Sequence, residues 1–410
     1  MQSVDRIHAL DAVRAYALIL GVVLHASACF IKGFPMPSWF DQPSTASPIM
    51  YYVIHMFRMS TFFLIAGLFA RMVVERRGIK PFIKDRAKRI GIPLLALPII
   101  AITLGIGGVL GALTHGVDFL KSLMEAQGQA GAQDTGGGFS IDLMHLWFLY
   151  YLLIFYALAL SIRSLVHRFD KRRVIANVCD RVVAFLMRGI WGPFLLGLPI
   201  ALYYMGNDNW FEWIGLPSPF SLAPSLIAIF AYGIAFSLGW MLHRQMNLIQ
   251  ELRNSWLIHF TLAVILTIVC LKIVGVEPST WGESTLEGQQ RIIYAICYMS
   301  GLWFWVFAFI GAAIRYMSYE SPVTRYISDA SYWIYLMHLG TVSFFMLAIR
   351  PYDWHWSIKL AIMLTGSMAI LLVTYHYLVR FTWIGAILNG RRHPRPAKAP
   401  MADAVLPANS

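Results

Sequence analysis

The chain has 410 residues, and it is too apolar for a water-soluble protein. Hydrophobic residues make up 58% of it and charged residues 13%, against about 25% charged in ordinary soluble domains. The formal net charge is +12 at pH 7, but Lys and Arg gather in alternate connections between apolar segments, which is a pattern of membrane topology. The basic charge is therefore no sign of nucleic-acid binding.

Ten apolar stretches are long enough to cross a bilayer, which takes about 20 residues of helix. They run over 15–33, 48–70, 91–113, 145–163, 183–204, 223–242, 256–275, 292–314, 331–349 and 358–379. The fifth stretch is the weakest because it contains Arg188 and two prolines. We predict an all-α integral membrane protein, a bundle of about ten transmembrane helices.

The connections between these stretches predict how the bundle is oriented. Lys and Arg, which collect on the cytoplasmic side, are abundant in both tails and in residues 71–89, 163–181, 243–255 and 315–330. The N- and C-termini are therefore expected in the cytoplasm. Residues 1–29 superficially resemble a secretory signal, but Asp5 and Asp11 are out of place in a basic leader, and we interpret the segment as a retained first span.

Residues 1–390 are expected to form one membrane domain, because no connection has room for a second one. The longest connection, at 114–144, is rich in Gly, Gln and Ala and is interpreted as a flexible hinge. Residues 391–410 are basic and rich in Pro and Ala, which predicts a disordered cytoplasmic tail. The four cysteines are scattered and the histidines never stand four residues apart, so we predict no metal site.

The first span carries polar residues along one helix face. Asp11, Arg14, Leu18, Gly21 and His25 recur at spacings of three and four residues. Arg14 and His25 are separated by about 16 Å of helix rise, so an anion at Arg14 could have its reactive group at His25. The alternative is a snorkelling arginine and an unrelated histidine that bonds a neighbouring helix.

The second span contains His55 and Arg58, which are three residues apart and share a face. A charged side chain inside a membrane is costly, so Arg58 must face the bundle interior. It would there pair with an acid, which is a purely structural role, or contact a polar ligand.

Two further arginines, Arg86 and Arg89, stand immediately before the third span. Their spacing presents two guanidinium groups on one face, which suits bidentate contacts to phosphate. A cytoplasmic excess of positive charge explains them equally well.

Aromatic and histidine residues mark the fourth and ninth spans. His145 and Trp147 stand at the outer end of the fourth, and Tyr335 and His338 are one turn apart in the ninth. Aromatic residues at the membrane interface account for most of this pattern.

Five segments in the same order carry a likeness to a known family. They are LDAVR with the histidine that follows, IHMFRMSTFFLIAG, RAKRIGIP, HLWFLYYL and SYWIYLMH. Together they identify the chain as similar to the acyltransferase-3 family of membrane O-acyltransferases over essentially its whole length. The likeness is greatest to the branch of periplasmic glucan succinyltransferases.

The resemblance implies transfer of an acyl group, succinyl in the named branch, from cytoplasmic acyl-CoA to hydroxyls of an extracytoplasmic glycan. Acyl-CoA would be a cosubstrate, with no tightly bound cofactor. The resemblance makes His25 essential and makes Arg14, Arg86 and Arg89 the contacts to coenzyme A. A bacterial inner membrane is the implied location.

The chemistry of acyl transfer suggests a role for each residue of the expected site. His25 would act as a general base or as a nucleophile, and the two routes remain open. A donor to the oxyanion would come from Arg58, His55 or Tyr335, in that order. The remaining candidates, which would contact the acceptor, are Asp11, His145, Trp147 and His338.

Two rival functions remain. A secondary transporter also combines many helices with buried polar residues, although its internal repeat is not visible here. An O-acetyltransferase acting on another cell-envelope polysaccharide shares the motifs of the wider family. The expected partners are acyl-CoA, the glycan and the lipid bilayer, with homo-oligomers or glucan-synthesis proteins left open.

Overall fold

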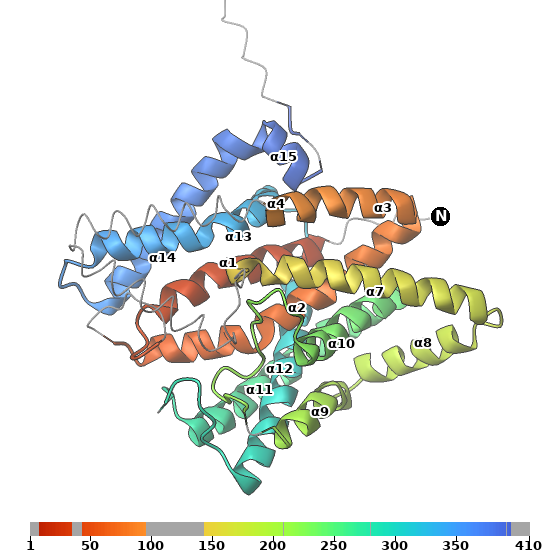
Figure 1. The fold of residues 1–410 in the computed structure, drawn as a ribbon, viewed down its shortest axis with the longest axis horizontal. Helices are drawn as coiled ribbons and strands as arrows, with labels where there is room; N and C mark the ends of the chain where they lie inside the picture. Colours follow the sequence, from red (N-terminus) through yellow and green to blue (C-terminus); the bar gives the residue numbers. More distant parts are fainter. Residues whose placement is uncertain are drawn as a thin grey trace, which may run out of the picture.

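The computed structural model describes residues 8–34, 43–95, 143–207, 209–278, 280–390 and 392–394. Within these ranges the regular elements are helices, as Figure 1 shows, which confirms the all-α class. In chain order they are α1 (His8–Ala28), α2 (Ala46–Arg77), α3 (Ile79–Arg86), η1 (Ala87–Gly91), α4 (Ile92–Leu95), η2 (Met144–Leu146), α7 (Trp147–Phe169), α8 (Val174–Met187), α9 (Trp191–Met205), α10 (Leu226–Leu242), η3 (His243–Leu248), α11 (Ile249–Val274), α12 (Gly288–Tyr316), α13 (Pro322–Ile349), α14 (Trp356–Thr374), η4 (Tyr375–Arg380) and α15 (Trp383–Leu388).

Seven helical stretches of the described chain are long and apolar enough to cross a membrane, and a bent pair raises the number to eight. One of the seven, Leu226–Val274, joins α10 and α11 through the turn η3, where Gln245 leaves the helical conformation. That stretch covers two of the predicted spans, 223–242 and 256–275. The chain is thus a multi-pass membrane protein, while the count of ten stays a prediction.

The predicted fifth span, 183–204, is wrong as a single straight helix. The chain forms α8 and α9 there, and the two axes meet at 108°. The break falls at Arg188, which is extended, and at Gly189, whose φ of +76° favours glycine. The predicted third span is described only up to Leu95, and the predicted hinge and tail lie almost wholly outside the described residues.

Two glycines bring α2 and α10 into backbone contact. A Cβ atom built on Gly67 would overlap the carbonyl oxygen of Phe236, and one built on Gly239 would overlap that of Leu64. Small residues that let helix backbones approach closely are a common device in membrane bundles. Since α2 carries His55 and Arg58, this contact holds one wall of the site in place.

The long helix α12, like α2, is among the most buried of the described helices that could cross a membrane. It packs against α11, α9, α1 and α2, and its largest buried side chains include Trp303, Phe304 and Phe307. The four cysteines are free thiols, and two of them, Cys29 and Cys270, are buried, where a free thiol packs as a small apolar group.

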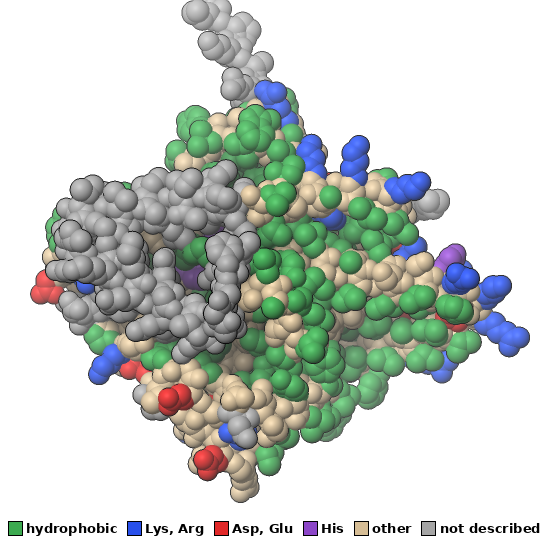
Figure 2. All heavy atoms as spheres, viewed as in Figure 1, with side chains coloured by type: hydrophobic (Ala, Val, Ile, Leu, Met, Phe, Trp, Pro, Cys, Tyr) green, Lys and Arg blue, Asp and Glu red, His purple; other side chains and the backbone are tan. Residues whose placement is uncertain are grey.

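The charged side chains are unevenly distributed over the surface. In the view of Figure 2 most Lys and Arg lie over α3, α15 and the far end of α7, and most of the visible Asp and Glu lie toward the opposite, lower left part. The cytoplasmic end of a membrane protein carries the excess of Lys and Arg. The arginine-rich end is called the basic end below.

Candidate active site

The first helix positions the two residues that the sequence pattern singled out. Arg14 and His25 lie on the single uninterrupted helix α1, as predicted. Between them stands Gly21, and a Cβ atom built on it would overlap Nη1 of Arg58. The missing side chain therefore makes room for the guanidinium of α2 to lie against α1, one turn from His25.

Three histidines from three segments form a cluster around His25. The ring centroids of His25 and His338 are 5.1 Å apart, and those of His338 and His145 are 5.3 Å apart. Tyr335, one turn before His338 on α13, donates a hydrogen bond of 2.5 Å to the carbonyl oxygen of His145. The fold thus brings together residues that the sequence placed on separate spans.

Hydrogen bonds to carbonyl oxygens set the proton positions on two of these rings. Nδ1 of His338 lies 2.7 Å from the carbonyl oxygen of Tyr335, and Nε2 of His145 lies 3.2 Å from that of Leu336. Since a carbonyl only accepts, these nitrogens carry the proton. The other nitrogen of each ring is buried without a hydrogen-bond partner in the described structure, so both rings keep a free lone pair when neutral.

Arg58 is a buried cation that forms no ion pair with a carboxylate among the described residues. Its Nε is buried and has no hydrogen-bond partner there. The nearby groups that act on it electrostatically are hydroxyls, those of Tyr51, Tyr335 and Tyr232. The purely structural alternative, an ion pair with an acid, therefore finds no partner in the described chain, and the guanidinium is left to bind an anion.

His55 lies nearer the edge of the cluster. Its ring stacks on Tyr51 at 5.5 Å, and Tyr51 stacks in turn on Trp213 at 5.7 Å. Electrostatic interactions link His25 to His338, Arg58, His145 and His55. His55 thus belongs to the same polar centre, and its ring is the first of a row of stacked rings that continues through Tyr51 to Trp213.

A cavity of about 320 Å³ brings the three predicted arginines together. Arg14 comes from α1, Arg86 from α3 and Arg89 from η1, so three elements contribute one cation each. The polar residues that complete its lining are Tyr156, Ser328, Ser331, Tyr332, Tyr335 and Asn389. The three residues that the resemblance makes contacts to coenzyme A thus border one cavity.

Arg14 is held at this cavity by polar contacts. Its Nη2 donates to Oγ of Ser328 at 2.8 Å and lies 3.5 Å from Oδ1 of Asp11. The guanidinium also lies over the ring of Phe69, 5.9 Å from the centroid. Asp11, predicted to contact the acceptor, is thus placed beside Arg14 and not beside the histidines.

Arg86 and Arg89 share one acid, Asp85, at 3.6 and 3.7 Å. Arg89 also donates from Nε to the carbonyl oxygen of Leu388, the last residue of α15. Burial, reinforced by the charge of Arg86, lowers the pKa of Arg89 below its ordinary value. Two arginines with one carboxylate leave positive charge that a phosphate would neutralise.

Tyr335 connects the cavity to the histidine cluster. Its ring borders the cavity, and the same side chain contacts His145 and lies 6.2 Å from His338 between ring centroids. A ligand with its anionic part at the arginines would therefore have its far end directed toward His25.

The structure does not bring Trp147 to this centre. Its ring is buried and packs against Phe63, Tyr151 and Tyr232. These contacts describe a core residue of α7.

Sequence reasoning missed two serines of the site. Ser328 and Ser331 precede the predicted residues Tyr335 and His338 on α13 at spacings of three and four residues, and both serines border the cavity. The spacing is present in the sequence, but small hydroxyl residues are common in apolar helices and do not by themselves indicate a site. Asn389, which follows α15, gave no signal at all.

Among the described residues, no group of three or more His, Cys, Asp or Glu is placed to hold a metal ion.

Comparison with known proteins identifies the family of the chain. A family model for an acyltransferase domain, that of the acyltransferase-3 family, matches residues 7–377. The chain belongs to this family, and with its apolar helices it is a multi-pass membrane acyltransferase.

Two relatives of the chain are named for glucan biosynthesis. It is 26% identical over 361 residues, 85% of each chain, to the glucans biosynthesis protein C of Escherichia coli O81 (strain ED1a). The protein of the same name from Escherichia coli strain SMS-3-5 / SECEC gives the same values. No solved structure matches the chain.

Proposed function

We propose that the protein transfers a succinyl group from cytoplasmic succinyl-CoA to hydroxyls of a periplasmic glucan, in the inner membrane of a bacterium. One observation carries the proposal: the cavity with Arg14, Arg86 and Arg89 at one end is bordered by Tyr335, whose side chain contacts the cluster of His25, His145 and His338. Succinyl as the group and glucan as the acceptor rest on the kinship with proteins named for glucan biosynthesis.

The two ends of the cavity suit the two ends of an acyl-CoA. The phosphates of coenzyme A would lie among the arginines, and the flexible arm would extend past Tyr335. The apolar residues that line the cavity, among them Leu18, Phe62 and Leu152, suit an uncharged arm.

In the general-base route the acyl group moves in one displacement. A lone pair of neutral His25 takes the proton of the acceptor hydroxyl, and the oxygen attacks the thioester carbonyl. The tetrahedral intermediate collapses with cleavage of the carbon–sulfur bond, and the thiolate leaves and is protonated by the imidazolium. In the alternative route His25 itself attacks, and the acyl-imidazole is then opened by the hydroxyl.

The negative charge that develops on the carbonyl oxygen needs a donor. Arg58 is the first choice, because its guanidinium lies against Gly21, is buried and has no carboxylate partner in the described chain. A preorganised cation in a water-poor site stabilises an oxyanion more than it would in water.

His338 would position His25. Its Nδ1 is bound to a carbonyl of its own helix, so the ring is fixed and its free Nε2 can accept a hydrogen bond. An imidazole that accepts from a neighbouring imidazole fixes the tautomer of its partner. We therefore assign His338 a positioning role in place of a contact to the glycan.

The sidedness of the reaction requires both termini in the cytoplasm. Arg14, near the start of α1, and Asn389, after α15, border the same cavity, which supports placing the two ends of the described chain on one side. That placement would require an even number of crossings. The accumulation of Lys and Arg at the basic end supports assigning that side to the cytoplasm.

Aromatic rings on the other side suit a sugar acceptor. Phe34, Phe211 and Trp281 are partly exposed, and Trp281 lies 5.5 Å from Trp213, which stacks on Tyr51. The row ends at His55, which stacks on Tyr51. Apolar faces of a glucose unit would pack on such rings, with a hydroxyl directed to the histidines.

The proposal is tested with purified protein in sealed vesicles. Labelled succinyl-CoA or acetyl-CoA is added outside and a glucan is enclosed, and the label on the recovered glucan is counted. Vesicles without protein and vesicles with the His25→Gln variant are the controls. We expect succinyl label on the enclosed glucan from the fraction of molecules whose basic end faces outward.

Each rival function gives a different result. Preferential transfer of acetyl groups, or transfer only to another envelope polysaccharide, would favour the O-acetyltransferase. Solute flux across the vesicle without label on any glycan would favour a secondary transporter and overturn the proposal.

A further inference from the structure

A second and larger cavity, of about 850 Å³, lies at the basic end on the other side of α2 from the arginines of the candidate active site. Its walls come from α2, α7, α8, α10 and the turn η3. The basic residues that line it are Arg71, Arg163, His167, Lys171, Arg173 and Arg244. No step of the proposed transfer uses any of them.

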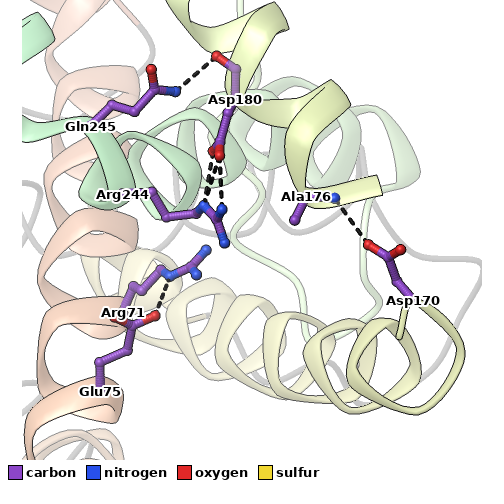
Figure 3. Close-up of polar contacts among 7 residues, drawn as sticks. All are labelled: Arg71, Glu75, Asp170, Ala176, Asp180, Arg244 and Gln245. Atoms are coloured by element: carbon purple, nitrogen blue, oxygen red, sulfur yellow. Dashed lines mark hydrogen bonds and ion pairs between the residues drawn. The ribbon is translucent and has the colours of Figure 1, made fainter. Parts of the chain in front are cut away.

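Two arginines enter this cavity from neighbouring elements (Figure 3). Arg71 comes from α2 and Arg244 from the adjacent turn η3, and their guanidinium groups end close to one another. Two like charges that face each other in this way favour an anion between them.

Each of the two arginines has a carboxylate partner but keeps free donors. Arg71 donates from Nε to Glu75 at 2.8 Å, and Arg244 donates from Nε and Nη2 to Asp180, also at 2.8 Å. These bonds raise the pKa of Arg244, which stays charged. Both Nη atoms of Arg71 and Nη1 of Arg244 form no hydrogen bond with the described residues, so these N–H groups remain for a ligand.

The remaining cations of the cavity form no direct ion pair, although the charge of Arg163 acts on Glu75. The side chains of Arg163, Lys171 and Arg173 form no ion pair in the described structure, and the lining acid, Asp170, is bonded to the backbone N–H groups of Val174 and Ala176. Five Lys and Arg thus face three carboxylates, those of Glu75, Asp170 and Asp180. A surplus of two positive charges is left.

The other part of the cavity wall is apolar. Ala159, Ile162 and Val166 of α7 face Phe236 and Trp240 of α10. The helices that border the opening also carry exposed apolar residues, such as Ile162 and Leu165 on α7 and Val178 and Phe185 on α8, each about half exposed. In a multi-pass membrane protein such faces lie in contact with lipid chains.

A cationic end joined to an apolar wall selects an anionic amphiphile. A free phosphate would satisfy the arginines but leave the apolar wall uncovered, and a zwitterionic lipid would bring an ammonium group into a basic cavity. We infer that this cavity binds an acidic phospholipid of the cytoplasmic leaflet, with its phosphate among Arg71, Arg163 and Arg244 and its acyl chains along α7 and α8. Basic pockets between helices are known to hold acidic lipid headgroups in this way.

The wild-type protein provides the first test. Its thermal unfolding in detergent is followed while phosphatidylglycerol, phosphatidylcholine or inorganic phosphate is added at equal concentration. Phosphatidylglycerol is expected to raise the midpoint in a saturable manner, because a ligand that binds only the folded state stabilises it. An equal rise with phosphatidylcholine, or an equal rise with phosphate, would overturn the inference.

The second test uses matched variants. Arg163→Gln combined with Arg173→Gln removes two cations that line the cavity, and both side chains lack a partner to be orphaned. The control, Arg168→Gln with Arg172→Gln, makes the same charge change on the same helix and turn but outside the lining. The first pair should raise the half-saturating concentration of phosphatidylglycerol about 30-fold, since two cations are removed at about 1 kcal/mol per Lys or Arg near a surface.

The control pair should leave that concentration within about twofold of the wild-type value. Equal effects of the two pairs would mean that general surface charge attracts the lipid, which contradicts a site. The active-site variant Arg86→Gln should leave lipid binding unchanged, so failure of this inference and failure of the proposed acyl transfer are separately visible.

Discussion

The imidazole rings of His25 and His338 lie with their centroids 5.1 Å apart, although α1 and α13 stand near the two ends of the chain. The pair combines a histidine expected to do the chemistry with one whose ring is fixed by its own helix. The closeness of these rings depends on α1 packing directly against α13. The roles of the two residues can be tested separately, because replacing each of them should change the kinetics of transfer in a different way.

Replacement of His25 by Gln should remove transfer. The amide has a similar length and polarity but accepts no proton and forms no acyl intermediate, so we expect a loss of at least about 10³-fold in kcat. Acyl-CoA should still bind with its wild-type dissociation constant. The measurement is label transferred to glycan, with size-exclusion chromatography to verify the fold, and substantial activity in this variant contradicts the mechanism.

His338→Phe tests the positioning role. The phenyl ring fills similar space but lacks the nitrogen that would accept from His25. We expect kcat to fall by about 10- to 100-fold with the KM for acyl-CoA unchanged, because the loss concerns orientation and not binding. A rise in KM for the glycan with normal kcat would instead return His338 to the role of an acceptor contact.

Arg86→Gln and Arg89→Gln should weaken binding of acyl-CoA. A hydrogen bond to a charged group contributes about 1.5–3 kcal/mol, so each variant should raise KM by about 10- to 100-fold with little change in kcat. Lys88→Gln is the matched control, since Lys88 stands between the two arginines in sequence, is exposed and does not line the cavity. An equal effect of the Lys88 variant would mean that surface charge and not the cavity attracts the donor.

Arg58→Gln separates two possible partners of the buried guanidinium. If Arg58 stabilises the oxyanion, transfer from succinyl-CoA and from acetyl-CoA should fall together, by about 10²- to 10³-fold. A selective loss with succinyl-CoA would show that Arg58 binds the distal carboxylate of the donor. We expect the parallel loss, because the guanidinium lies one turn of α1 from His25, where the carbonyl would react.

Much of the site was predictable because its residues follow helical spacing. Arg14 and His25 share α1, and Arg86 and Arg89 stand three residues apart, so their common face could be read directly. The meeting of α1, α2, η2 and α13 could not be derived from spacing, because it depends on contacts between distant segments. His338 was therefore placed on the acceptor side, although it contacts His25.

The differences between prediction and structure have local physical causes. The predicted fifth span contains Arg188 and Gly189, and the helix is interrupted there because Arg188 is extended and Gly189 has a positive φ. Trp147 is predicted as a site residue because it stands two positions after His145, yet its ring packs against Tyr232 on another side of α7. Apolar length predicts that a segment crosses the membrane, but it does not say which side of a helix meets which neighbour.

The contact of α2 with α10 predicts that Gly239→Ala lowers the stability of the protein, whereas helix propensity alone predicts a gain. Ala is favoured over Gly in a helix by about 1 kcal/mol, so Gly239→Ala would stabilise an isolated α10. In this bundle the new methyl group would overlap the carbonyl of Leu64, and backbone cannot move aside as a flexible side chain can. We expect the free energy of unfolding to fall by about 1–3 kcal/mol, measured as a lower unfolding midpoint in detergent.

Gly206→Ala is the control, because nothing lies within 4 Å of a Cβ atom there. Since α2 carries Arg58 and His55, the Gly239 variant should also lose transfer activity on mild heating before the control does, and equal stability of the two variants would contradict the close approach.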